Sequence, residues 1–418
     1  MPMSDTFKKR LFPKVEKIAD HFGTPFHIYD EAGIRETGRA LVSALAGAPG
    51  FREFFAVKAL PNPKIMEIMK SMGFGFDCSS IPELVLSRKL GAGPDDIMFT
   101  SNNTSAEEFA AALAEGGCIL NLDDISLIDK VPKIPDLICF RYNPGERRTG
   151  NAIIGNPVEA KYGLTHDQMV AAYQAVYDRG VRRFGLHAMI ASNERNYTYM
   201  VTTAEMLLDL AGEISRAVPV RFEFINIGGG LGIPYRPEDK PLDIKAMGEN
   251  IAAAFFRFSQ NNGYAPNLFI ESGRYMTGPH GALVTRVINH KDIYRKYVGV
   301  DASMSALMRP GIYGAHHEIS VPGREGGNLE RVDVVGALCE NIDKFAVQRL
   351  IPETREGDLM VIHDTGAHGI AMGFNYNGRL RPKELLLRED GAVELIRRQE
   401  TMDDYFATLK FEKKVLSD

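Results

Sequence analysis

Eight short apolar runs in the first two thirds of the chain constrain its fold more than any other feature of the sequence. Each run has four to six residues, is rich in β-branched or aromatic side chains, and alternates with segments of helical pattern. The runs cover residues 54–57, 74–77, 96–100, 118–122, 137–142, 184–187, 224–227 and 268–271. Continuous apolar strands that alternate with helices are typical of buried parallel strands in βα units.

The number of these units indicates the architecture. Eight βα units over about 250 residues are what a (β/α)8 barrel requires. An open, doubly wound sheet is the alternative, which periodicity alone does not exclude. Capping boxes, in which a Ser or Thr pairs with a Glu or Gln three residues later, predict helix starts at Ser105, Thr165 and Thr202. We predict an α/β fold with a TIM-type barrel.

The sequence changes character after about residue 285. Short strand-like runs lie between turn-rich loops there, which predicts a second, mainly β domain. These runs cover residues 282–288, 296–301, 331–335, 358–362 and 384–387. One more strand is predicted near residues 25–29, and its pattern alone allows it to join either domain.

Charge and composition exclude several classes of partner. The 418 residues hold 49 Lys and Arg against 54 Asp and Glu, a net charge of −5, so no global basic field attracts nucleic acid or a membrane. No stretch approaches the roughly 18 uncharged apolar residues of a membrane span, and the start lacks the apolar core of a secretory signal. Four cysteines without a CxxC pair, and adjacent His316 and His317 without ligand spacing, predict no metal site. We expect a cytoplasmic protein, with these two histidines at its surface.

Polar residues follow several predicted strands at their carboxyl ends, where the loops of a barrel build its active site. Lys58 follows the first strand, Asp77 ends the second and His187 ends the sixth. The seventh strand runs into the glycine-rich stretch 228–232, and the eighth into Glu271-Ser-Gly-Arg274. We therefore expect these residues to lie at one end of the barrel.

Three of these features fit the needs of pyridoxal phosphate. In an apolar setting the ammonium of Lys58 loses hydration, which lowers its pKa and frees a nucleophilic amine. Taken alone, however, a single lysine at a strand end is more often one that extends into solvent. Glycines after the seventh strand let backbone N–H groups approach a phosphate. Glu271 can hold a cationic ring nitrogen, and Arg274 offers a fork to phosphate or carboxylate. A lysine, a phosphate loop and a strand-end carboxylate together predict this cofactor.

The same motifs, with others further along, resemble those of the diaminopimelate decarboxylases. That family belongs to the fold type III pyridoxal-phosphate enzymes, which include ornithine and arginine decarboxylases. The similarity runs from about Thr24 to about Leu387 and rests on residues 55–59, 75–80, 226–235, 271–274, 308–313, 336–340 and 376–379. It implies an alanine racemase-like barrel over residues 30–285 and a mainly β domain of residues 1–29 plus 286–418, which completes the active site and a dimer interface.

The resemblance implies a role for each residue around the cofactor. Lys58 resembles the lysine that holds the cofactor covalently, and His187 resembles the histidine that stacks on its ring. Glu271 resembles the carboxylate that keeps the ring nitrogen protonated. The other residues implied in cofactor binding are Asp77, Gly229, Gly230, Gly273, Arg274 and Tyr376.

On the substrate side, the resemblance assigns Cys339 as the proton donor. The residues implied in binding a small amino-acid substrate are Arg274, Arg309, Tyr313, Glu340, His368 and Tyr376. Cys339 and Glu340 are expected to reach across the interface of a homodimer with shared active sites. A distal carboxylate on the substrate needs a cation, here Arg309, and a distal ammonium needs an anion, here Glu340.

The implied reaction is the decarboxylation of meso-2,6-diaminopimelate to L-lysine and CO2. The pair Cys339-Glu340 favours it, because ornithine-type enzymes typically carry aspartate after the cysteine. Two alternatives stay open. One is a related decarboxylase of the ornithine, lysine, arginine or carboxynorspermidine type, and the other is a non-catalytic regulator on the same scaffold.

Three positions depart from the family pattern. The usual His-Ile-Gly-Ser reads His187-Ala-Met-Ile-Ala-Ser192, so a serine contact to phosphate is lost or displaced. The usual Glu-Pro-Gly-Arg reads Glu271-Ser-Gly-Arg274, without the fixed backbone angle of proline. The usual Gly-Ala-Tyr reads Gly366-Ala-His368, so a histidine replaces a tyrosine that touches cofactor and substrate.

Overall fold

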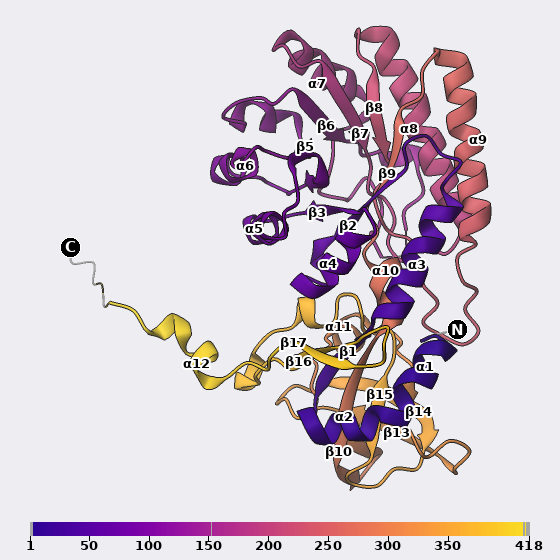
Figure 1. Ribbon diagram of the computed structural model, residues 1–418, viewed down its shortest axis with the longest axis vertical. Helices are drawn as coiled ribbons and strands as arrows, with labels where there is room; N and C mark the ends of the chain where they lie inside the picture. Colours follow the sequence, from indigo (N-terminus) through magenta and orange to yellow (C-terminus); the bar gives the residue numbers. More distant parts are fainter. Residues whose placement is uncertain (1–2, 152, 413, 415–418) are drawn as a thin grey trace. The chain divides into compact units, whose positions relative to one another are not determined.

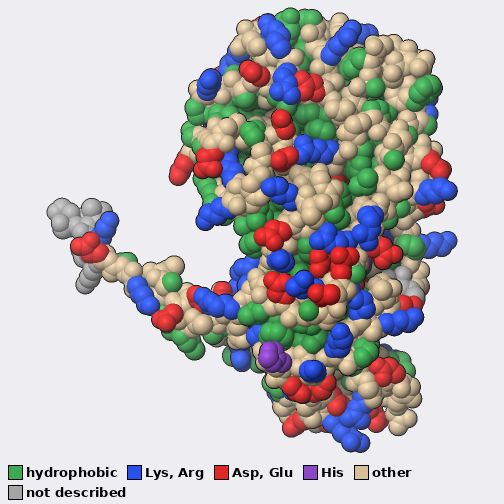
Figure 2. Space-filling view, in the orientation of Figure 1, with side chains coloured by type: hydrophobic (Ala, Val, Ile, Leu, Met, Phe, Trp, Pro, Cys, Tyr) green, Lys and Arg blue, Asp and Glu red, His purple; other side chains and the backbone are tan. Residues whose placement is uncertain are grey.

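The computed structural model describes residues 3–151, 153–412 and 414, and these form two compact units. The first comprises Ile34–Gly278, and the second joins the described residues before Ile34 to those after Gly278. We call them the barrel unit and the sheet unit (Figure 1). Acidic and basic side chains are interspersed over the visible face of each unit (Figure 2). Among the described residues, no helix is long and apolar enough to cross a membrane.

The barrel unit contains a closed barrel of eight parallel strands, as predicted. Its strands are β2 (Arg52–Ala56), β3 (Gly75–Cys78), β4 (Ile97–Phe99), β5 (Ile119–Leu122), β6 (Leu137–Arg141), β7 (Arg183–His187), β8 (Phe222–Asn226) and β9 (Asn267–Ile270). The last strand, β9, pairs in parallel with β2 and closes the ring. Closure excludes the open, doubly wound sheet, and each of the eight apolar runs overlaps one barrel strand.

Helices lie on the outside of the barrel strands (Figure 1). They are α3 (Glu31–Ala44), α4 (Pro63–Ser71), α5 (Ile81–Lys89), α6 (Ala106–Leu113), α7 (His166–Asp178), α8 (Tyr197–Ala217) and α9 (Ile244–Asn262), and a short α10 (Arg274–Thr277) follows β9. The capping boxes at Ser105 and Thr165 are confirmed. The helix start predicted at Thr202 is wrong, because α8 begins earlier, where the Asn196 side chain accepts from the Thr198 N–H.

Apolar side chains fill the barrel and hold its strands in register. They are Phe54, Met98, Ile119, Leu137, Cys139, Phe224 and Phe269. The rings of Phe224 and Phe269 stack with centroids 4.4 Å apart. Gly185 on β7 leaves room for this stack, since a Cβ there would lie 2.0 Å from the Phe224 ring. The packed interior gives the strand ends a rigid base.

The sheet unit is built on nine strands. They are β1 (Phe26–Asp30), β10 (Gly281–Asp292), β11 (Lys296–Val300), β12 (Ile319–Ser320), β13 (Leu329–Val335), β14 (Lys344–Pro352), β15 (Leu359–Ile362), β16 (Lys383–Leu387) and β17 (Val393–Arg397). The main order is β14-β13-β11-β10-β1-β16-β17, and β15 pairs with β10 and β12. Because β1 pairs with both β10 and β16, the strand near residues 25–29 belongs to this unit.

Short helices complete the sheet unit. Residues of α1 (Asp5–Leu11) and α2 (Val15–Phe22) share one core with β1, β10, β15 and β16, and α11 (Arg309–Tyr313) and α12 (Met402–Tyr405) lie later in the chain. Strands β12, β14 and β17 were not predicted, because short or half-exposed strands lack a continuous apolar run. The predicted boundary at residue 285 also differs from the division at Gly278, since the long strand β10 lies wholly in the sheet unit.

Candidate active site

Lys58 and Asp77 face each other at the carboxyl ends of neighbouring barrel strands. Lys58 lies in the turn directly after β2, and Asp77 lies on β3, in register with Ala56. Lys58 Nζ is 2.7 Å from Asp77 Oδ2. The Lys58 side chain is 49% exposed whereas that of Asp77 is 1% exposed. The Lys58 amine is therefore accessible to a ligand, and the buried Asp77 carboxyl holds it through the ion pair.

The expectation of a lowered pKa for Lys58 is wrong. Burial lowers the pKa, but the carboxyls of Asp77 and Glu271 outweigh burial and raise the pKa of Lys58 above its usual value. The apolar residues that precede Lys58 therefore do not set its charge. Two acids from other strands do so, and they favour the ammonium form.

Glu271 follows β9 and is held by side chains from β7 and β8. Its Oε1 accepts a hydrogen bond from Asn226 Nδ2 at 2.7 Å, and its Oε2 accepts one from His187 Nε2 at 3.2 Å. Burial favours the neutral acid, yet His187, Lys58 and Asn226 lower the pKa of Glu271 below its usual value. The pKa of Asp77 is shifted in the opposite direction. Burial and the negative charge of Glu271 raise it, and these effects outweigh the lowering effect of Lys58. The two carboxyls titrate as a pair, in which Glu271 takes the negative charge first.

His187 ends β7, and Asn121 on β5 orients its ring. Asn121 Nδ2 donates to His187 Nδ1 at 2.8 Å and to Thr100 Oγ1 at 3.0 Å. Because Nδ1 accepts, the ring proton lies on Nε2, which donates to Glu271. Sequence reasoning missed both Asn121 and Asn226. The available signal was a polar residue within an apolar barrel strand, since a buried amide there needs a hydrogen-bond partner.

The glycine-rich stretch after β8 packs closely against other strand-end segments. Gly228 and Gly230 have φ angles of +70° and +93°. A Cβ at Gly229 would lie 2.1 Å from the carbonyl oxygen of Glu271, and one at Gly230 would lie 2.3 Å from that of Ala191. The Gly229 N–H donates to the sulfur of Met189 at 3.2 Å. A thioether is a weak acceptor, so a phosphate oxygen would make the stronger hydrogen bond to this N–H.

Arg274 begins α10, and Gly273 brings the chain close to β2 just before it. A Cβ at Gly273 would lie 2.6 Å from the Cβ of Ala59, so only glycine lets this turn pass beside the residue that follows Lys58. Arg274 Nη1 donates to the hydroxyl of Tyr235, and its guanidinium carbon lies 5.8 Å from that ring. Tyr235 is thus a further member of this group that sequence reasoning had not assigned.

The groups in the barrel unit fit pyridoxal phosphate. An exposed amine, an ionised carboxylate and a compact glycine backbone with Arg274 match its aldehyde, ring nitrogen and phosphate. Among the described residues, the buried Oδ1 of Asp77 has no hydrogen-bond partner. A buried polar atom without a partner at the strand ends is what a site completed by a ligand leaves.

In the sheet unit, a buried histidine anchors Arg309. Arg309 begins α11, is 7% exposed, and its Nη1 donates to His317 Nε2 at 2.8 Å. His317 Nδ1 in turn donates to the carbonyl oxygen of His363 at 2.8 Å. The prediction that His317 lies at the surface is wrong, because it is fully buried with hydrogen bonds at both ring nitrogens.

All four cysteines are free thiols. Cys339 is exposed on a loop of the sheet unit, whereas the other three are buried. Asp343 shapes this loop by accepting from the Leu338 N–H at 2.8 Å. The Cys339 N–H donates to Asn377 Oδ1 at 2.7 Å. This hydrogen bond joins the loop to the short segment that contains Tyr376.

The remaining predicted substrate residues also belong to the sheet unit. Tyr313 is 62% exposed and Tyr376 is 48% exposed. His368 is partly buried and has a φ angle of +56°, and Glu340 accepts from the Ile342 N–H at 3.4 Å. The predicted cofactor residues therefore lie in the barrel unit, with the exception of Tyr376. The predicted substrate residues lie in the sheet unit, with the exception of Arg274.

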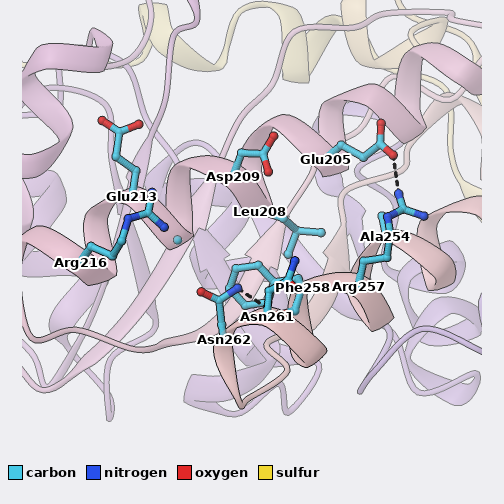
Figure 3. A pocket seen from close by; sticks show the side chains of 11 residues that line it. Glu205, Leu208, Asp209, Glu213, Arg216, Ala254, Arg257, Phe258, Asn261 and Asn262 are labelled. Atoms are coloured by element: carbon cyan, nitrogen blue, oxygen red, sulfur yellow. Dashed lines mark hydrogen bonds and ion pairs between the residues drawn. The ribbon is translucent and has the colours of Figure 1, made fainter.

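A hollow of about 640 Å³ between α8 and α9 contains none of these residues (Figure 3). Its lining includes the ion pair between Glu205 and Arg257 at 2.7 Å. Charges of both signs line it, with Asp209, Glu213 and Arg216 in addition to that pair. It is a solvated hollow between two outer helices and is separate from the candidate site.

A comparison with known families matches residues 32–278 to the family described as "Pyridoxal-dependent decarboxylase, pyridoxal binding domain". This range includes every residue of the barrel group described above. The chain belongs to the pyridoxal-dependent decarboxylases. It is an enzyme of the fold type III group and uses pyridoxal phosphate.

Relatives of this decarboxylase resemble it over nearly its whole length. Protein TabA of Pseudomonas amygdali pv. tabaci is 47% identical over 99% of this chain and 97% of its own. The diaminopimelate decarboxylase of Methanothermobacter thermautotrophicus is 38% identical over 93% of this chain and 92% of its own. The crystal structure of diaminopimelate decarboxylase from M. jannaschii in complex with L-lysine has a TM-score of 0.88 at 28% identity, covering 94% of each chain.

Proposed function

We propose that this enzyme decarboxylates meso-2,6-diaminopimelate to L-lysine and CO2. The observation that carries the proposal is Arg309, a buried guanidinium held by His317. A buried cation suits the second carboxylate, which distinguishes diaminopimelate from ornithine and lysine. Relatives named diaminopimelate decarboxylase, and a neighbour solved with L-lysine, support the same substrate and product.

The residues of the barrel unit act on the reacting end of the substrate in this proposal. Lys58 holds the cofactor covalently, and Asp77 orients the lysine amine through the contact at 2.7 Å. Glu271, kept ionised by His187 and Asn226, holds a proton on the ring nitrogen. The bound cofactor supplies an electron sink for the electron pair that is left when CO2 departs. Gly229, Gly230, Gly273 and Arg274 hold the phosphate.

The residues of the sheet unit act on the rest of the substrate. Cys339 returns a proton to the α-carbon, and Glu340 binds the distal ammonium. Arg309 binds the distal carboxylate, with Tyr313 beside it. Tyr376 and His368 contact cofactor and substrate, and His368 takes the place that a tyrosine has in the family pattern.

We also propose that the enzyme is a homodimer with shared active sites and works in the cytoplasm. Exposed Tyr313 and Tyr376, with the exposed thiol of Cys339, support a surface that a second copy covers. The four free cysteines support a reducing compartment.

A related diamino or basic amino acid is the second candidate substrate. His368 in place of tyrosine, and 47% identity to a relative not named as a diaminopimelate decarboxylase, favour it. Both observations concern the substrate and leave the cofactor chemistry unchanged.

The test is a substrate panel with product identification. CO2 release is measured from meso-diaminopimelate, ornithine, lysine and arginine, with Lys58→Ala as the inactive control. Turnover of meso-diaminopimelate to L-lysine with the highest kcat/KM is expected. Turnover of another substrate without activity on diaminopimelate would replace the first proposal by the second. Wild-type protein that binds the cofactor and releases no CO2 from any of them would contradict both.

A further inference from the structure

Ser272, between Glu271 and Gly273, makes a hydrogen bond that a proline at this position could not make. Its backbone N–H donates to Glu53 Oε1 at 2.6 Å. Both residues are 1% exposed. Proline has no N–H to donate, so the serine and the glutamate belong together as a pair.

The pair lies on the seam that closes the barrel. Strands β2 and β9 are in register at Arg52 with Phe269 and at Glu53 with Ile270. Beyond that ladder, the carbonyl oxygen of Ser272 accepts from the Ala56 N–H at 3.2 Å. The side chain of Glu53 and the backbone of Ala56 therefore bind Ser272 at its N–H and at its carbonyl.

This seam connects the two strands that carry the cofactor residues. Lys58 follows β2 two residues after Ala56, and Glu271 directly precedes Ser272. The neighbouring turn is just as tight, since a Cβ at Gly273 would lie 3.2 Å from the Cβ of Ala56. Any slip of Ser272 along β2 would move Glu271 relative to Lys58.

We propose that Glu53 is a positioning residue for the cofactor, which holds the Glu271 carboxylate in register with the Lys58 amine through the Ser272 N–H. The proposal rests on the assignment of Lys58 and Glu271 to the cofactor. Glu53 is a buried acid that has no part in the family pattern or in the proposed reaction.

The charge state of Glu53 agrees with such a task. Burial, together with the charges of Glu271 and Asp77, raises its pKa well above the usual value, although the N–H and the side chain of Ser272 oppose this. The raised pKa favours the neutral form of Glu53, which accepts the N–H without adding a negative charge beside Glu271. Among the described residues its Oε2 has no hydrogen-bond partner, so one oxygen alone carries the contact.

Matched variants on both sides of the bond test the proposal. Ser272→Pro removes the N–H, whereas Ser272→Ala keeps it. Glu53→Leu removes the acceptor, whereas Glu53→Gln keeps a neutral carbonyl acceptor of the same length. The dissociation constant of pyridoxal phosphate is measured by titrating each apoprotein and following the visible absorbance of the bound cofactor, and the Tm of each apoprotein is measured alongside.

We expect Glu53→Leu and Ser272→Pro each to weaken cofactor binding about tenfold, and the two conservative variants to stay within about twofold of wild type. The double variant should bind the cofactor about as tightly as the single variant with the lower affinity, because each change removes the same hydrogen bond. Should Glu53→Leu fail to fold, the Ser272→Pro and Ser272→Ala pair decides.

A lowered apoprotein Tm with unchanged cofactor affinity in Ser272→Pro and Glu53→Leu, the two variants that remove the hydrogen bond, would overturn the positioning role and leave a structural one. Multiplying effects in the double variant would also overturn it. Lys58→Ala that still forms the visible absorbance would instead contradict the cofactor assignment itself. None of these readouts depends on which amino acid is decarboxylated.

Discussion

The two groups of candidate site residues are built in different ways. In the barrel unit Asp77, His187 and Glu271 are buried at the ends of strands whose register the closed barrel sets. In the sheet unit Cys339 and Tyr376 lie on exposed loops and short turns. Buried, hydrogen-bonded groups hold a cofactor in one geometry, whereas exposed loops vary without loss of the fold. We therefore expect the sheet group to differ between decarboxylases with different substrates, apart from Arg309, which is only 7% exposed.

The largest effect should come from the barrel group. We expect Lys58→Ala to lower kcat by about 10⁴-fold or more, because it removes the residue proposed to bind the cofactor covalently. CO2 release at saturating cofactor measures it, and Lys64→Ala on α4 is the control, since that side chain is also exposed, at 40%. Activity within tenfold of wild type would contradict the assignment of Lys58 as the residue that binds the cofactor covalently.

The exposed thiol of the sheet group should affect turnover and leave cofactor binding unchanged. Cys339→Ala is expected to lower kcat by about 10²-fold, the usual contribution of a positioned proton donor. The dissociation constant of the cofactor should stay within twofold of wild type, roughly 0.4 kcal/mol. If affinity and kcat fell together, the assignment of Cys339 as proton donor would be wrong.

A smaller effect should separate substrate binding from catalysis. His317→Leu removes the acceptor at 2.8 Å from Arg309 Nη1, so we expect KM for meso-diaminopimelate to rise about tenfold with little change in kcat. His316→Leu is the control, since its ring bonds Glu318 instead. An equal rise in KM for both variants would show that the Arg309 contact has no special part in substrate binding.

The smallest effect concerns the pH dependence of stability, which should differ between the two units. Burial lowers the pKa of His27 and His280 to about 4 and that of His363 to about 3, from 6.5. These rings, all in the sheet unit, are neutral when folded and take up protons on unfolding. The three histidines therefore lose stability as the pH falls from 6.5 toward these values. Burial raises the pKa of Asp364, also in the sheet unit, to about 7, so this one acid offsets part of that loss. In the barrel unit the pKa of Asp77 is likewise raised to about 7, which adds stability on acidification, and the lowered pKa of Glu271 matters only below its usual 4.5.

Hydrogen exchange at pH 7 and pH 6 measures this difference. Peptides of the sheet unit should lose protection before those of the barrel strands. His280→Phe should reduce the loss of unfolding free energy between the two pH values by about 0.7 kcal/mol, the share of one histidine. A sheet unit that gains stability on acidification would contradict the neutral assignment of these rings.

Local pattern predicted the barrel because its strands are buried on both faces and must be apolar, as at Phe54 and Phe224. It did not predict β14 or β17, whose residues are partly exposed. Position in the barrel also predicted Lys58, Asp77, His187 and Glu271 as one group, since parallel strands bring their carboxyl ends together. The polar residues that orient this group, Asn121 and Asn226, interrupt apolar strands, but the sequence does not show which distant side chains they bind.

The identities of the reacting residues can thus be read along the chain, since each depends on its own strand. Their charges and partners cannot, since these depend on residues that are distant in the sequence. The apolar neighbours of Lys58 indicate a lowered pKa, whereas Asp77 and Glu271 raise it. At position 272 the sequence shows only a serine in place of proline, and the partner of Ser272, Glu53, lies 219 positions away. Packing alone brings such groups within hydrogen-bonding distance, where burial strengthens the electrostatic effect of each neighbour.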